Sequence, residues 1–221
     1  MTFSLLARDP ATGAIGGAAA TGSLCVGGWV LRGTLAGGMS ASQGKAPSTF
    51  WGEDVLGAME AGQSAQKAVD SVVSADPGAA QRQLSALPLA GPGAVYSGGD
   101  NTPEIGEHLF EGGVAAGNML ADPEVAEALA QGFTQAGGAF PERLLAGLRA
   151  AEAAGSDSRG LQSAALLVLS PAHAPLTLRV DWSETPLDAL AALLARATSG
   201  DYAAWAAQVP CLDDPTRTFD G

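Results

Sequence analysis

The sequence predicts an α+β protein in which two antiparallel sheets stack face to face, with helices on both outer sides, as a four-layer α-β-β-α sandwich. Strand-like and helix-like segments come in blocks: strands, two helices, strands, two helices, a strand pair and a helix. Short turn-like segments join most neighbouring strands, and such turns connect antiparallel rather than parallel strands. Alanine is the commonest apolar residue and aromatic residues are few, which favours closely packed layers.

The first 43 residues predict two pairs of strands. The first strand ends in a turn that contains Asp9, Pro10 and Gly13, which supply the required backbone geometry. Its return strand has very small side chains, which allow a neighbouring layer to approach closely. The four predicted strands are 2–8, 14–20, 27–33 and 34–43.

Later segments alternate between helices and strands in the same way. Ser64 is a candidate N-cap, and Asp122 precedes a proline in a typical helix start. The predicted helices cover 49–59, 64–75, 122–133, 141–154, 186–197 and 202–208. The predicted strands cover 84–89, 94–97, 105–110, 113–116, 163–169 and 176–182.

Composition excludes several classes of function. The net charge of −12 would repel nucleic acids and anionic membranes. No run of about 18 apolar residues suggests a membrane span, so we expect a cytoplasmic protein. We also expect its substrate to be a small molecule. The faces of small residues are compatible with a homodimer. No linker-like segment divides the chain, which favours one domain over residues 1–221.

Cysteine and histidine give no sign of a metal or other cofactor, and we expect none. Cys25 and Cys211 match no metal-binding spacing, and two free thiols are favoured over a disulfide. His108 and His173 lie far apart in sequence without a partner at a known ligand spacing.

Thr2 is the first candidate catalytic residue. A small residue after Met1 permits removal of the methionine, which would leave Thr2 with a free α-amine. That amine has a pKa of about 8 and could take the proton of the threonine hydroxyl, so that one residue supplies nucleophile and base. The alternative is an ordinary strand start.

Asn118 is the second candidate catalytic residue. The segment 117–120, Gly-Asn-Met-Leu, closes a predicted strand, and the asparagine amide could stabilise an oxyanion. The alternative is a turn that uses glycine and asparagine for their left-handed conformations.

Candidate substrate-binding residues occur in two segments. Asp157, Arg159, Gln162 and Ser163 form the densest polar cluster and could recognise a carboxylate or an amide. The alternative is a solvated connection. Gln43 ends a predicted strand and could hydrogen-bond a ligand, whereas the nearby Lys45 is more typical of a surface charge.

Three motifs in this order resemble the bacterial domain-of-unknown-function 1028 family. They are residues 2–13, residues 117–120 and residues 159–165, and the resemblance extends over about 2–182, leaving 183–221 as a helical extension. The family is similar to the N-terminal nucleophile (Ntn) hydrolase superfamily, a four-layer sandwich in which the first mature residue attacks an amide carbonyl. The resemblance implies that Thr2 is this residue.

The first hypothesis is therefore a hydrolase of small amide-type C–N bonds, with Thr2 as nucleophile and Asn118 as oxyanion donor. A non-catalytic ligand-binding or structural protein that retains the fold is the alternative. A third hypothesis is an enzyme that uses internal residues without a free N-terminus.

Overall fold

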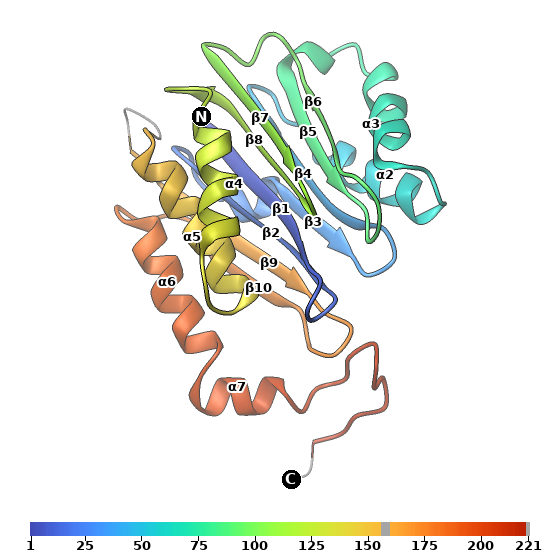
Figure 1. Cartoon of the computed structure of the whole chain (residues 1–221), viewed down its shortest axis with the longest axis vertical. Helices are drawn as coiled ribbons and strands as arrows, with labels where there is room; N and C mark the ends of the chain where they lie inside the picture. The colour runs from blue at the N-terminus through green and yellow to red at the C-terminus, as the bar shows by residue number, and fades with distance from the viewer. Residues whose placement is uncertain (156–159, 220–221) are drawn as a thin grey trace.

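Two antiparallel sheets form the centre of the computed structural model, which describes residues 1–155 and 160–219. The six-stranded sheet has the order β10-β9-β2-β1-β8-β7, and the four-stranded sheet has the order β3-β4-β5-β6 (Figure 1). The strands are β1 Thr2–Asp9, β2 Ala14–Thr21, β3 Leu31–Thr34, β4 Gly38–Gly44, β5 Arg82–Leu87, β6 Ala94–Ser97, β7 Glu104–Phe110, β8 Gly113–Leu120, β9 Ser163–Leu169 and β10 Leu176–Val180. The predicted antiparallel pairing is confirmed.

The helices pack on both sheets. Helices α2 and α3 contact the four-stranded sheet, while α4, α5 and α6 contact the six-stranded sheet (Figure 1). The described helices are α1 Val26–Trp29, α2 Thr49–Glu60, α3 Ala65–Ser74, α4 Val125–Gln135, α5 Phe140–Ala153, α6 Pro186–Ala197 and α7 Gly200–Ala206. None of these helices combines the length and the apolar character needed to cross a bilayer.

Successive side chains of β1 point alternately toward the helices and toward the four-stranded sheet. Phe3 and Leu5 belong to the apolar cluster under α4, α5 and α6, whereas Leu6 belongs to a second cluster between the sheets. Because successive strand residues point to opposite faces, Thr2 and Ser4 lie on the same face as Leu6. The start of β1 therefore presents polar side chains toward the four-stranded sheet.

The predicted strand 27–33 is wrong in its first half, because α1 occupies Val26–Trp29. Cys25 starts this helix with φ = 60°, and the Val26 amide donates to the Ser163 hydroxyl at 3.1 Å. That partner is 137 residues away, so the local sequence pattern could not reveal it.

Other local predictions have mixed outcomes. Ser64 caps α3, because its hydroxyl accepts a hydrogen bond from the Lys67 amide. Helix α4 begins at Val125 rather than at Asp122, whose carboxylate accepts from the Glu124 amide in the preceding turn. The sulfurs of Cys25 and Cys211 are free thiols, as predicted.

Gly38, at the edge of the core, should be the glycine at which an added side chain destabilises the protein most. Its φ is +106°, and an added Cβ would collide with the Leu87 carbonyl oxygen. We expect Gly38→Ala to lower the free energy of unfolding by about 2–4 kcal/mol through backbone strain and overpacking. Gly62 has φ = +89° and open space around its Cβ position, so Gly62→Ala should cost only about 1 kcal/mol. Urea unfolding of both variants measures the difference, and equal losses would contradict the steric explanation.

Asp76 forms an ion pair that connects the end of α3 to β5. The Arg82 Nε donates to Asp76 Oδ2 at 2.7 Å, and the Gly78 amide donates to Asp76 Oδ1 at 2.7 Å. The hydrogen bond from Arg82, followed by that from Gly78, lowers the pKa of Asp76 below its usual value. A depressed pKa means that the native state favours the charged carboxylate.

The stabilising effect of Asp76 should therefore be complete above the pKa of the unfolded state and disappear as the pH falls through the folded pKa. We expect an NMR titration to place the Asp76 pKa below its usual value in the wild type and closer to it in Arg82→Gln. The stability difference between the wild type and Asp76→Asn should also shrink in acid. An unchanged pKa in Arg82→Gln would contradict this assignment.

Candidate functional site

Polar side chains form two rows at one end of the interface between the sheets. On the six-stranded sheet, Ser163, Thr21, Thr2 and Asn118 are cross-strand neighbours on β9, β2, β1 and β8. We call these four residues the first row. On the four-stranded sheet, Gln43, Gln83 and Ser97 are cross-strand neighbours on β4, β5 and β6, and we call them the second row.

Gln83 connects the two rows. Its Oε1 accepts hydrogen bonds from Gln43 Nε2 at 2.6 Å and from Asn118 Nδ2 at 3.1 Å. Its Nε2 donates to Ser97 Oγ at 2.7 Å and to the Gly117 carbonyl at 2.9 Å. Gln83 is fully buried, so these bonds fix the orientation of the amides on both sides of the interface.

The Thr2 hydroxyl lies beside a second hydroxyl. Thr2 Oγ1 and Thr21 Oγ1 are 3.0 Å apart, and Thr21 Oγ1 donates to the Met1 carbonyl at 2.6 Å. The Gly22 amide also donates to that carbonyl, at 3.4 Å. Thr21 therefore contacts both sides of the Met1–Thr2 peptide bond.

In the two rows, two buried amide oxygens accept no hydrogen bond from the described residues. Gln43 Oε1 and Asn118 Oδ1 have no hydrogen-bond partner among the described residues. Buried polar atoms without a partner are uncommon in proteins and call for an explanation. Both residues adjoin Thr2: the Gln43 amide donates weakly to the Thr2 carbonyl at 3.5 Å, and Asn118 is the cross-strand neighbour of Thr2.

A cleft of about 580 Å³ opens at this end of the sheets. Of the predicted site residues, Thr2 and Gln43 line it, and so does Lys45. The described lining residues are Met1, Thr2, Thr21, Ser23, Leu24, Val26, Trp29, Val30, Gln43, Gly44, Lys45, Pro47 and Met119. Its volume suits a small organic molecule.

Backbone strain occurs on both sides of the cleft. Met119 has φ = 52° and Cys25 has φ = 60°, and these are the non-glycine residues with positive φ in the described part of the chain. Met119 lines the cleft, and Cys25 lies between the lining residues Leu24 and Val26. Such strain is typical of functional sites. Asn101 helps to hold Met119, since its carbonyl accepts from the Met119 amide at 3.0 Å.

The predicted site residues thus have different positions. Asn118 is completely buried, and one N–H of its amide is used by Gln83. Ser163 Oγ donates to the Ser23 carbonyl and accepts from the Val26 amide, so it holds the wall of the cleft. Gln162 is joined to β2 through its backbone, which donates to the Thr21 carbonyl at 2.8 Å. Asp157 and Arg159 lie outside the described residues.

Sequence reasoning did not identify Thr21 and Gln83 as site residues. In β5, polar residues alternate with apolar ones: Gln83 and Ser85 with Leu84 and Ala86. This alternation indicates a strand with one polar face, and it was the sequence signal that could have identified Gln83. Thr21 ends a strand of glycine and alanine, but nothing in its local sequence indicates the proximity to Thr2. Among the described residues, no three metal-ligating side chains gather into a site.

The fold and the site define an α+β protein with a buried polar network between two sheets and a cleft at one end. Residues 2–190 match the model of the family of unknown function DUF1028, and the chain belongs to this family. A crystal structure of a DUF1028 protein from Silicibacter pomeroyi is 54% identical, with a TM-score of 0.96 over 100% of this chain and 96% of that chain. No curated protein matches the chain significantly.

Proposed function

We propose that the protein is an N-terminal nucleophile hydrolase that cleaves a small amide-type C–N bond, with Thr2 as nucleophile after removal of Met1. Two antiparallel sheets with helices against each support the proposed four-layer sandwich of that superfamily. The location of Thr2 supports the chemistry, because β1 is a central strand and its first residue faces the cleft.

In the proposed reaction, Thr2 Oγ1 attacks the amide carbonyl carbon while the α-amine of Thr2 accepts the hydroxyl proton. The C–N bond then breaks, and the amine leaves with the proton that the α-amine had taken. An ester between Thr2 and the acyl group remains. Water hydrolyses this ester, releases the acid and restores the threonine hydroxyl.

Neighbouring residues have proposed supporting roles. Removal of Met1 would release the Thr21 hydroxyl from the Met1 carbonyl, so that it could orient the Thr2 hydroxyl 3.0 Å away. The second N–H of Asn118 is the proposed oxyanion donor, since Asn118 is the cross-strand neighbour of Thr2. Gln43 lines the cleft and would bind polar substrate groups.

The observation that carries this proposal is the Thr2 hydroxyl, which lines the cleft within 3.0 Å of Thr21 Oγ1. A β-lactone tests it without knowledge of the substrate, because attack by the threonine hydroxyl opens the ring and leaves a covalent ester. We expect the intact mass to rise by one lactone and peptide mapping to place the adduct on Thr2. Protein that lacks Met1 but remains unlabelled would contradict the proposed nucleophile.

One observation favours the second candidate, a non-catalytic ligand-binding protein. Met1 is only 4% exposed, and its carbonyl accepts hydrogen bonds from Thr21 and Gly22. If the native protein retains Met1, the amine of Thr2 is part of a peptide bond and cannot act as a base. The intact mass of protein from its native host shows whether the Thr2 amine is free, as the hydrolase mechanism requires.

A further inference from the structure

The cleft has one wall that is apolar and open to solvent. Leu24 and Trp29 are 53% and 52% exposed, although both are large apolar residues. They line the cleft together with Val26 and Val30. An apolar group of a bound molecule could cover the side chains of Leu24 and Trp29, which would remove their apolar surface from water.

Lys45 gives the cleft a positively charged side chain. It is the one charged side chain among the described residues that line the cleft, in a chain whose net charge is −12. An anionic ligand would therefore be repelled by most of the molecule and attracted at this point.

A hydrogen bond to the buried Asn101 fixes the position of the Lys45 backbone. Its amide donates to Asn101 Oδ1 at 2.8 Å, and the buried Asn101 side chain donates to the carbonyls of Arg82 and Gly98. The preceding Gly44 has φ = +134°, and an added Cβ would lie 2.5 Å from the Gln81 carbonyl oxygen. The chain therefore leaves β4 after Gly44 and places the exposed Lys45 beside the cleft, two residues beyond a member of the second row.

From this arrangement we infer the substrate class, an inference that rests on the proposed hydrolase function. The substrate is an N-acyl amino acid with an apolar acyl group. Its amide carbonyl lies at Thr2, its carboxylate lies beside Lys45, and its acyl group packs against Trp29 and Leu24. Hydrolysis releases an apolar carboxylic acid and a free amino acid.

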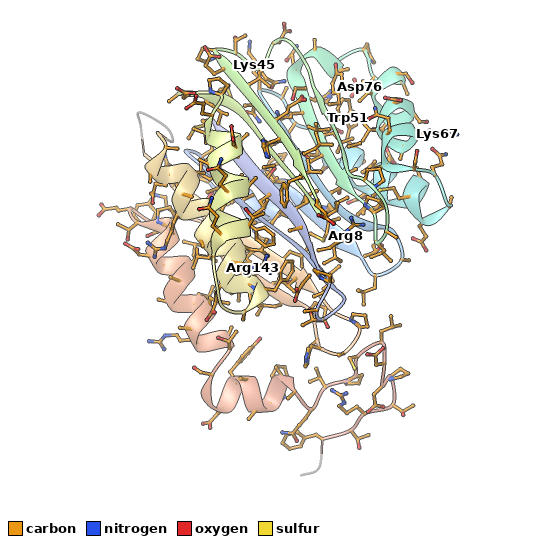
Figure 2. All side chains as sticks on the ribbon, in the orientation of Figure 1. Arg8, Lys45, Trp51, Lys67, Asp76 and Arg143 are labelled. Carbon is orange, nitrogen blue, oxygen red and sulfur yellow. The ribbon has the colours of Figure 1, made fainter. Side chains whose placement is uncertain are left out.

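The chain provides a matched control, because its lysines are Lys45 and Lys67. Lys67 belongs to α3 and is exposed. Figure 2 shows Lys45 at the end of the molecule where the chain begins and Lys67 at the outer edge of α3. Replacing either lysine with glutamine removes one positive charge, but only Lys45→Gln removes it from the cleft.

The test compares phenylacetyl-leucine with phenylacetyl-leucine amide, which has the same shape without the carboxylate. Binding is measured by calorimetry on Thr2→Ala, a background without the proposed nucleophile. We expect the acid to bind about fivefold more tightly than the amide at low ionic strength. Added salt and Lys45→Gln should abolish this preference, and Lys67→Gln should leave it intact.

The apolar wall of the cleft is tested with acetyl-leucine, which has the same amino acid but a much smaller acyl group. Phenylacetyl-leucine should bind about tenfold more tightly than acetyl-leucine because its larger acyl group buries more apolar surface, and Trp29→Ser should remove most of this difference. Equal binding of acid and amide, or no binding of any of these compounds, would overturn the inferred substrate class. Hydrolysis of both phenylacetyl compounds at equal rates would also overturn it, while the hydrolase function would stand. Lys45-dependent binding of the acid without hydrolysis by processed protein would support the ligand class and count against the hydrolase function.

Discussion

Thr2→Ala is expected to lower kcat for amide hydrolysis by about 10⁴-fold or more, because it removes the attacking oxygen and leaves the rest of the site in place. Thr2→Ser is the matched control, since it keeps a hydroxyl beside the α-amine and should remain within about tenfold of the wild type. Alanine, serine and threonine are all small, so Met1 should be removed from all three proteins. Intact mass confirms the N-terminus before the rates are compared.

This experiment also distinguishes the remaining hypotheses. A processed Thr2→Ala protein that retains full activity would contradict Thr2 as nucleophile and indicate an enzyme that uses internal residues. In that case Asn118→Ala should lose activity while Thr2→Ala keeps it. Full retention of Met1 in the native host would exclude the Thr2 mechanism and leave the description of the fold unchanged.

Gln83→Leu should have the largest effect on stability among polar substitutions at the site. Leucine nearly fills the same volume but makes none of the four hydrogen bonds of Gln83, and it leaves Gln43, Asn118, Ser97 and the Gly117 carbonyl short of a buried partner. We expect a loss of about 3–5 kcal/mol in the free energy of unfolding. Urea unfolding with an unchanged m-value would measure it.

Gln66 provides the control for this substitution. Its amide donates to Asp70 on the exposed face of α3 at 2.8 Å, where water can replace the bond. Gln66→Leu should therefore change the free energy of unfolding by no more than about 0.5 kcal/mol. Similar losses in the two variants would show that Gln83 does not organise the interface.

The sequence allowed the antiparallel sheets to be predicted because turns and alternation are local properties. Strand 163–169 agrees with β9, and the helix at 186–197 agrees with α6. The start of α1 was missed because its capping hydroxyl, that of Ser163, comes from a distant strand. Local patterns carry no information of this kind.

The site was predictable only in part, for a related reason. Thr2, Gln43 and Asn118 were recognised as chemically capable residues, and the structure places them together. Thr21 and Gln83 became visible only through strand register: Thr2 pairs with Thr21 on one side and Asn118 on the other, and Gln83 faces them from the second sheet. The roles of all five residues in catalysis remain predictions.

The burial of Met1 bears on when Met1 can be removed to free the amine of Thr2 in the proposed mechanism. In the folded protein the Met1 side chain packs in the cluster beneath α4, α5 and α6, and its carbonyl is hydrogen-bonded. We expect these contacts to slow an aminopeptidase, although Met1 and Thr2 line the cleft. If Met1 is removed, we therefore expect its removal to compete with folding and to occur on the nascent chain. We expect a molecule that folds first to keep Met1 for longer and, under the proposed mechanism, to be inactive for that time.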